Sequence, residues 1–175
     1  VLLLLIFRSP IAAALPLLTV GLVFGVSTSL AAAAASAIGA EVGQELPARD
    51  FAVTRADLVR YAGAAGDFNP IHYSDRVAMS VGLTGVIADG MYTMALGARV
   101  VSDWAGSPTA VVSYGVRFTK PVVVPDDDDG VVVTIGGRVT EVLDDGQVRV
   151  ELTARCGSEK VLGQARATVR MTAAP

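Results

Sequence analysis

Three stretches with different hydrophobic patterns divide the chain. Residues 9–40 contain no ionisable side chain, and Arg8 is the only charge before residue 41. Residues 41–104 mix turn residues with helical spacing, whereas apolar residues recur at every second position after Gly106. Apolar residues spaced three and four positions apart predict a helix, and apolar residues at every second position predict half-buried strands. The pattern therefore predicts an apolar N-terminal segment followed by a domain of helices and then strands.

The apolar segment 1–40 is long enough to cross a bilayer, since about 20 apolar residues in a helix span the hydrocarbon core. A cleaved signal peptide is one alternative, but its charge should precede the apolar core, and here Arg8 interrupts it. A buried helix is another, but residues 11–26 show no polar face. We favour a membrane-spanning segment that would anchor the domain. Because Val1 stands where methionine is expected, a fusion or start-site artefact stays open for this segment.

Capping signals place the first helix of the domain. Residues 41–50 are polar and are predicted to form a linker, with the domain itself covering 51–175. Thr54 and Asp57 have the spacing of a capping box, in which each side chain binds the other residue's backbone amide. The helix should stop before Gly66, because glycine and the Asn-Pro pair that follows both disfavour helix.

Residues 89–104 form the longest predicted helix, and four strands are predicted after it. The proposed buried face of the helix consists of apolar residues at three- and four-residue steps: Met91, Met94, Ala95, Ala98, Val101 and Trp104. The strands are placed at 111–124, at 131–142, around 148–155 and around 165–170, with hairpin turns at 144–146 and 157–159. An antiparallel sheet on one long helix is an α+β fold.

Composition narrows the functional classes. The chain has 175 residues, of which 52% are hydrophobic, with one His and one Cys. One His and one Cys cannot complete a closed four-ligand zinc site, so no metal ion is expected. The chain has no basic run, so no nucleic-acid partner is expected either. The acidic run 126–129 lacks the neighbouring oxygen ligands of an EF-hand, which favours a solvated turn over a calcium loop.

Candidate chemistry centres on the only histidine. His72 follows Asp67 by five residues, across a Gly/Asn/Pro turn that can aim both side chains into one cavity. A lone histidine is often structural, and that reading stays open. Imidazole nevertheless suits proton transfer near neutral pH, and a nearby carboxylate can orient it or carry a second proton. We predict that Asp67 and His72 form a catalytic pair.

The sequence around this pair is similar to a known family. YAGAAGDFNPIHYSD resembles the hydratase-2 motif of the MaoC-like dehydratases, which are (R)-specific enoyl-thioester hydratases with a hot-dog fold. The resemblance runs from Val42 to Met171, includes VGLTGVIADGM and VRFTKPVVVPD, and is nearest to the β subunits of mycobacterial-type (3R)-hydroxyacyl-ACP dehydratases. LLLLIFRSPIAAALPLLTVGLVFG resembles a membrane segment of MmpL-type lipid transporters, although no proton-relay residues of a transporter are present.

The resemblance implies roles for four residues. Asp67 and His72 match the family's catalytic pair, which binds the water added to or removed from the C2–C3 bond. Asn69 matches a residue that holds the catalytic loop. Gly90 matches the glycine whose amide, at the start of the central helix, binds the thioester carbonyl. An amide placed there would stabilise the negative charge that develops on that oxygen.

The resemblance also implies a reaction and its partners. The reaction is the reversible dehydration of (3R)-hydroxyacyl thioesters to trans-2-enoyl thioesters, as in type II fatty-acid elongation. No metal or redox cofactor is implied, and the acyl chain arrives on CoA or an acyl carrier protein. Those carriers imply a cytoplasmic catalytic domain, with or without an anchor in residues 1–40. The hot-dog fold implies a homodimer or a heterodimer with a second hot-dog subunit.

Asp89 is the main departure from the family, which usually has His before the Gly-Met pair. A carboxylate about 4 Å from the enolate would oppose it by about 4 kcal/mol at an effective dielectric constant near 20. Aspartate is also a preferred N-cap, and a cap that points outward would largely avoid this penalty. We favour the cap, and assign Asp89 and Met91 to substrate binding or loop support. A catalytically weakened acyl-thioester-binding or scaffolding subunit remains the alternative function, with a thioesterase third.

Overall fold

The computed structural model describes residues 39–143 and 145–171. The predicted membrane segment 1–40 therefore lies outside the described residues, apart from its last two. No helix within the described ranges is long and apolar enough to span a bilayer. Ala40 is fully buried in the core of the domain, so the packed structure already includes the last residue of the apolar segment.

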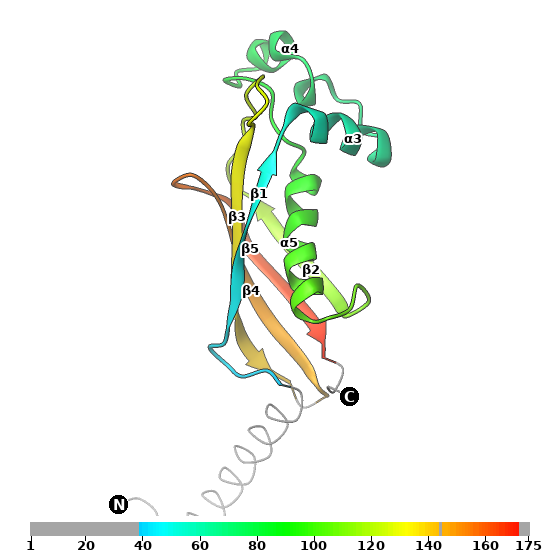
Figure 1. The fold of residues 1–175 in the computed structure, drawn as a ribbon, viewed down its shortest axis with the longest axis vertical. Helices are drawn as coiled ribbons and strands as arrows, with labels where there is room; N and C mark the ends of the chain where they lie inside the picture. Colours follow the sequence, from blue (N-terminus) through cyan, green and yellow to red (C-terminus); the bar gives the residue numbers. More distant parts are fainter. Residues whose placement is uncertain (1–38, 144, 172–175) are drawn as a thin grey trace, which may run out of the picture.

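Five antiparallel strands form one sheet, in the order β1-β3-β4-β5-β2 (Figure 1). The strands are β1 (Glu45–Val53), β2 (Val111–Phe118), β3 (Val131–Val142), β4 (Gln147–Cys156) and β5 (Glu159–Arg170). The predicted alternation in β4 is confirmed, because Val148, Val150, Leu152 and Ala154 are all buried. The sheet supports a single long helix, and the predicted α+β class is confirmed.

The predicted linker 41–50 is wrong from Glu45 onward, where β1 begins. β1 lies at the edge of the sheet and pairs only with β3, with a register shift between Leu46 and Arg49. An edge strand tolerates Pro47, which has no amide to donate. Because the irregular register breaks the apolar alternation, the sequence pattern hides this strand.

The strand predicted at 111–124 is also too long, since β2 ends at Phe118. The following residues leave the sheet and run beside the segment that precedes the long helix. There the Ala88 amide donates to the Val122 carbonyl at 2.8 Å, and the Val124 amide donates to the Val86 carbonyl at 2.9 Å. This short pairing places residues 119–124 next to the start of the helix.

The long helix, α5 (Gly90–Trp104), lies along one face of the sheet (Figure 1). Its buried residues are Thr93, Leu96, Gly97, Val100 and Val101, so the predicted face was wrong except at Val101. The first nine residues of α5 carry no charge, and hydrophobic spacing could therefore not define which side is buried. Gly97 permits the close packing expected of a small residue, because a Cβ there would collide with the Tyr114 hydroxyl.

Shorter helices gather at one end of the molecule, away from the marked C-terminus (Figure 1). The helix α3 (Arg55–Ala65) begins with the predicted Thr54–Asp57 capping box and ends at Gly66 with a left-handed φ of 70°, as expected. A 3-10 turn, η1 (Pro70–His72), and a short helix, α4 (Asp75–Ser80), follow; neither was predicted. The residues of the predicted catalytic pair lie in and beside η1.

Candidate active site

Local hydrogen bonds shape the turn that carries Asp67 and His72. The left-handed Gly66 ends α3, and the Asp67 carboxylate then accepts the Asn69 amide at 3.0 Å. The Asn69 side chain in turn accepts the Ile71 amide at 3.3 Å and caps η1. Asn69 thus takes part in two hydrogen bonds within the loop, and its exposed side chain lies outside the cavity described below.

One hydrogen bond determines which imidazole nitrogen of His72 carries the proton. The Nδ1 atom of His72 lies 2.8 Å from the Ile87 carbonyl oxygen. Because a carbonyl only accepts hydrogen bonds, Nδ1 carries the proton, and Nε2 of the neutral ring presents a lone pair. The Ile87 amide also donates to the Ile71 carbonyl at 3.2 Å, so two hydrogen bonds tie Ile71 and His72 to Ile87.

The His72 side chain lies close to two carboxylates. One ligand atom each of Asp67, His72 and Asp89 lies within 4.8 Å of the other two, and Nε2 is 3.8 Å from Asp89 Oδ2. The predicted proximity of Asp67 and His72 is therefore confirmed. The hydrogen bond from the Asn69 amide holds the pKa of the Asp67 carboxyl below its usual range. Asp67 is thus ionised at neutral pH.

Asp89 caps α5 as predicted, since its Oδ1 accepts the Met91 amide at 2.6 Å. The outward orientation expected for this cap is wrong: Asp89 is only 9% exposed, and its second oxygen faces His72. The hydrogen bond between the Ile87 amide and the Ile71 carbonyl brings η1 next to the residues that precede α5. His72 of η1 therefore lies against the Asp89 carboxylate. Met91 supports the cap through its backbone, while its side chain is exposed.

Gly90, the first residue of α5, lies at a cavity of about 360 Å³. Its amide makes no hydrogen bond to any residue within 39–143 or 145–171 and is free to donate. A Cβ at this position would lie 3.0 Å from the Phe118 ring, so a side chain would disturb the packing between α5 and β2. A free amide at a helix N-terminus is suited to bind a developing oxyanion.

The cavity is mostly apolar and is completed by residues far away in the sequence. His72 and Gly90 share its lining with further residues: Ile87, Ala88, Thr93, Phe118, Thr119, Lys120, Pro121, Val122, Val161 and Leu162. Asp67 and Asp89 line a smaller recess beside it, and His72 borders both. Spacing alone could not find the walls from β2 and β5, although VRFTKPVVVPD, noted for its resemblance, contains five of these residues.

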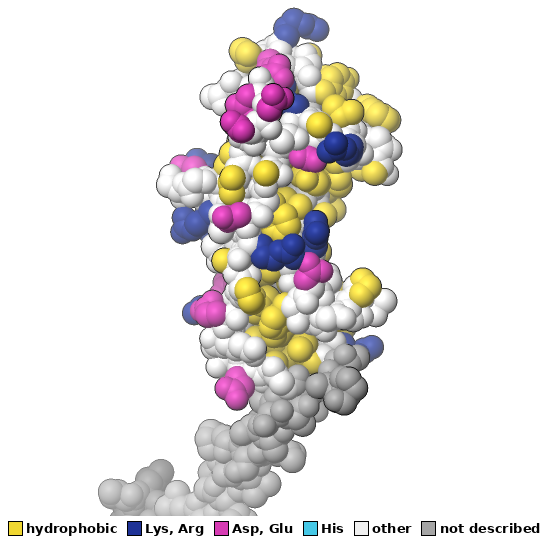
Figure 2. All heavy atoms as spheres, in the orientation of Figure 1, with side chains coloured by type: hydrophobic (Ala, Val, Ile, Leu, Met, Phe, Trp, Pro, Cys, Tyr) yellow, Lys and Arg dark blue, Asp and Glu magenta, His cyan; other side chains and the backbone are white. Residues whose placement is uncertain are grey.

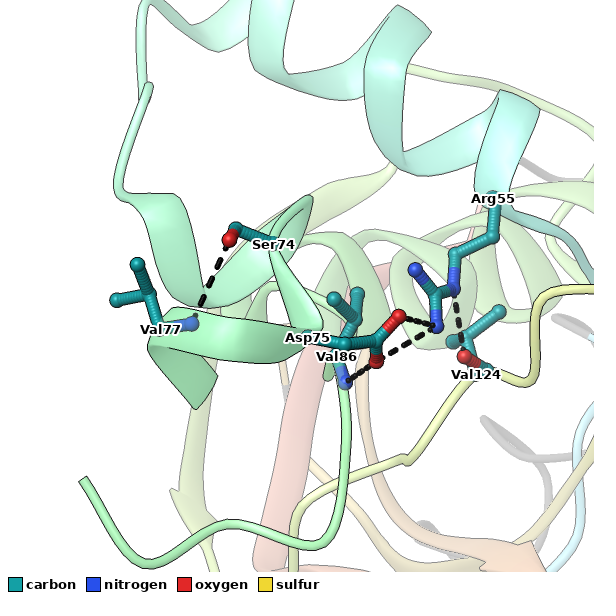
Figure 3. A network of polar contacts seen from close by, with 6 residues as sticks. All are labelled: Arg55, Ser74, Asp75, Val77, Val86 and Val124. Carbon is teal, nitrogen blue, oxygen red and sulfur yellow. Dashed lines mark hydrogen bonds and ion pairs between the residues drawn. The ribbon is translucent and has the colours of Figure 1, made fainter. Parts of the chain in front are cut away.

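A second polar network holds the segment before Asp89 (Figure 3). Arg55, at the start of α3, donates to the Val124 carbonyl at 2.7 Å and to both carboxylate oxygens of Asp75 at 2.9 and 3.0 Å. Asp75 also accepts the Val86 amide at 3.0 Å. Because Val86 precedes the carbonyl that orients His72, this network ties both helices α3 and α4 to the site.

Comparison with known proteins identifies the family. The sequence model described as "MaoC like domain" matches residues 34–155, more than half of the chain. The chain therefore belongs to the MaoC-like dehydratase family, and the hot-dog fold is confirmed. A second model, "MMPL family", matches residues 1–51, in agreement with the resemblance of the apolar segment.

Two curated relatives are dehydratases. The chain is 44% identical to "3-hydroxyacyl-thioester dehydratase X" of Mycobacterium tuberculosis over 79 residues, which cover 45% of this chain and 27% of that protein. It is 32% identical to the "3-hydroxybutyryl-CoA dehydratase" of Methylorubrum extorquens over 112 residues, which cover 63% of this chain and 68% of that protein. The chain thus spans about a quarter of the first relative.

Solved structures share the architecture. A "MaoC-like dehydratase" superposes with a TM-score of 0.73 at 41% identity, covering 75% of this chain and 41% of that one. A chain of the ChsH1-ChsH2 complex from Mycobacterium tuberculosis superposes with a TM-score of 0.67 at 26% identity, covering 75% of this chain and 98% of that one. The structural likeness thus covers three quarters of the chain.

Proposed function

We propose that this domain catalyses the reversible hydration of trans-2-enoyl thioesters to (3R)-hydroxyacyl thioesters. The observation that carries the proposal is the position of His72, which borders both the apolar cavity and the recess of Asp67. The free Gly90 amide opens onto the same cavity. A proton-transfer group, a carboxylate and an oxyanion donor therefore converge where a thioester can enter.

The cavity suits an acyl thioester. Its apolar walls, including Phe118, Val161 and Leu162, fit a hydrocarbon chain. Lys120 at the same cavity offers a cation to the phosphates of CoA or of an acyl carrier protein's phosphopantetheine. The substrate would enter with its carbonyl oxygen toward Gly90 and its C2–C3 bond toward His72. The carriers place the proposed reaction in the cytoplasm.

Chemically, His72 Nε2 takes one proton from a bound water while the water oxygen bonds to C3. The π electrons of the C2–C3 bond move onto the thioester oxygen, where the Gly90 amide stabilises the enolate. The imidazolium then returns its proton to C2, which regenerates the thioester carbonyl. Asp67 accepts a hydrogen bond from the same water and stabilises the transient positive charge on His72. Dehydration runs through the same steps in reverse.

The proposal extends to a dimer, either of two copies or with a second hot-dog subunit. Three large apolar side chains near the site are strongly exposed: Phe68, Met91 and Val59, at 65%, 53% and 64%. Hydrophobic side chains are also visible on the side of the molecule where α3 and α5 lie (Figure 2). The ChsH1-ChsH2 structure shows that a similar chain occurs in a complex of two proteins.

A second function, an acyl-thioester-binding subunit with weakened catalysis, is favoured by one observation. The Asp89 carboxylate adjoins Gly90, where the enolate would form. Asp89→Asn keeps the N-cap and removes the charge. The enzyme proposal expects an unchanged or lower rate in this variant, because the carboxylate also faces His72. An increase of about a hundredfold or more would favour the binding subunit.

The test is the loss of enoyl-thioester absorbance with the full chain and substrates of short and long acyl groups. His72→Ala and Asp67→Asn should each lower kcat/KM by about a thousandfold, since a positioned acid–base group contributes 10²–10⁴-fold. Asp145→Asn, in the turn between β3 and β4, is the matched control and should retain the rate. Near-wild-type turnover in either site variant would refute the assigned roles.

A further inference from the structure

We propose that Tyr114 limits the length of the acyl chain that the cavity accepts, because its side chain fills the space into which the cavity would otherwise extend between α5 and the sheet. This inference rests on the proposed function, since it concerns the same cavity. It narrows the substrate class to thioesters of short acyl chains. The argument starts from two contacts between β2 and α5.

Two aromatic side chains of β2 pack on α5 at glycines that are seven residues apart. Phe118 lies against Gly90, where a Cβ would be 3.0 Å from the ring, and a Cβ at Gly97 would collide with the Tyr114 hydroxyl. Residues seven apart share one face of a helix, and residues four apart share one face of a strand. The two contacts are therefore successive steps along a single interface between β2 and α5.

The cavity ends between these two contacts. Gly90 and Phe118 line it, and Thr93 is the lining residue farthest along α5. Gly97 follows on the same face, one turn or about 6 Å further along the helix. Neither Gly97 nor Tyr114 belongs to the lining. The volume of about 360 Å³ is near the lower end of the range for small-molecule sites, which suits a short acyl chain.

Tyr114 occupies this position at a cost in stability. Its hydroxyl is buried without a hydrogen-bond partner among residues 39–143 and 145–171, and burial raises the pKa of Tyr114 to about 12. An unpaired buried hydroxyl is unfavourable, whereas a phenylalanine ring would fill most of the same space without that penalty. Departures from the most stable choice are expected where function requires them.

The surroundings of the Tyr114 side chain are otherwise suited to a hydrocarbon chain. Gly97 has no side chain, Leu152 lies 3.6 Å from the position that a Cβ of Gly97 would take, and Ala167 pairs with Tyr114 across the sheet. Leu152 and Ala167 are at most 2% exposed. Removing the ring should therefore open an apolar space next to the inner end of the cavity at Thr93.

The test is the dependence of kcat/KM on acyl length, measured with the full chain and trans-2-enoyl-CoA substrates. The value should rise with length and reach a plateau at a short chain. Tyr114→Val should move the plateau by at least two carbons, and Tyr114→Leu by less. Each additional buried methylene should raise kcat/KM about fourfold, so the longest substrates should gain about tenfold or more in Tyr114→Val.

Phe51→Val is the matched control, because it removes a partly buried aromatic ring from β1, at the opposite edge of the sheet from β2. It should keep the wild-type plateau. A double variant tests whether space is the cause: adding Gly97→Leu to Tyr114→Val refills the same region from the helix and should restore the short plateau.

Calorimetric binding of saturated acyl-CoA gives a readout without turnover, and its affinity should stop rising at the same chain length. Three outcomes would overturn the inference: an unmoved plateau in both Tyr114 variants, an equal shift in Phe51→Val, or a long-chain gain that survives Gly97→Leu. Turnover with an unmoved plateau removes this inference alone. Absent turnover, with a binding plateau that moves in Tyr114→Val, removes the proposed function alone.

Discussion

The sheet and the segment 66–90 are built on opposite principles. In β4, the inward residues Val148, Val150, Leu152 and Ala154 are at most 1% exposed, and the strand is stabilised by apolar packing. Segment 66–90 has few buried side chains and is held by hydrogen bonds among turns and short helices. One region supplies stability, and the other supplies a polar geometry that apolar packing could not provide.

This difference predicts where stability and activity separate. Core packing gains free energy in proportion to buried apolar area, whatever the direction of the contacts. The site instead depends on directed contacts, such as Nδ1 of His72 on the Ile87 carbonyl. Substitutions in the sheet should therefore change the free energy of unfolding, whereas those in segment 66–90 should change the rate first.

The largest effect on stability is expected from Leu152→Ala. Leu152 is 1% exposed, and its side chain packs near Gly97 of α5. Removing it should lower the free energy of unfolding by about 3 kcal/mol, through lost burial and the cavity left behind. Val132→Ala, at a position 48% exposed, is the control and should change it by less than about 0.5 kcal/mol. Similar losses in both variants, measured by denaturant unfolding, would contradict the proposed role of the sheet.

Gly90→Ala should lower kcat/KM by about tenfold to a hundredfold, because the new methyl group meets the Phe118 ring and displaces the amide donor. Unfolding should change much less. Adding Phe118→Leu should restore part of the rate by making room. If the double variant is no faster than Gly90→Ala, the defect does not come from this contact.

Asp75→Asn should have a smaller effect, about fivefold on kcat/KM, since a displaced catalytic geometry lowers the rate without removing any reacting group. The variant weakens the pairing with Arg55 and the contact with the Val86 amide (Figure 3). Arg60→Gln is the control, because it breaks the exposed pair with Asp57 at the same helix. An equal loss of rate in the control would show that the Arg55–Asp75 network does not position the site.

The smallest effect is a pH dependence of stability from Asp57. Hydrogen bonds from Thr54, with the nearby Arg60, hold the pKa of Asp57 below its ordinary value of 3.8. A lowered pKa in the folded state stabilises the protein above the unfolded pKa, and this contribution is lost as the pH falls through the folded value. Asp57→Asn should therefore flatten the loss of stability below about pH 4, by about 1 kcal/mol or less. An unchanged slope would exclude this capping box as its source.

Regular patterns explain which parts of the fold were predictable. The alternation in β4 and the Thr54–Asp57 spacing depend on neighbouring residues and were confirmed. β1 was missed because a bulge and Pro47 break its period at the sheet edge. The buried face of α5 was misassigned because apolar residues surround its first turns.

The candidate site was predictable only in part. The turn between Asp67 and His72 is local, so the sequence could predict that they meet. The second oxygen of Asp89 reaches His72 only because Ile71 pairs with Ile87, a contact between segments that no local pattern specifies. The cavity walls at Phe118 and Leu162 likewise depend on the sheet order that places β2 beside β5.

The central claim is that the His72 imidazole both takes the proton from water and delivers it to C2, on one side of the substrate. It is tested most directly by hydrating a trans-2-enoyl thioester in D₂O with the full chain and determining the configuration of the product. The account predicts a (3R)-hydroxyacyl thioester with one deuterium at C2, added to the same face as the hydroxyl group. Deuterium on the opposite face, or no hydration at all, would contradict it.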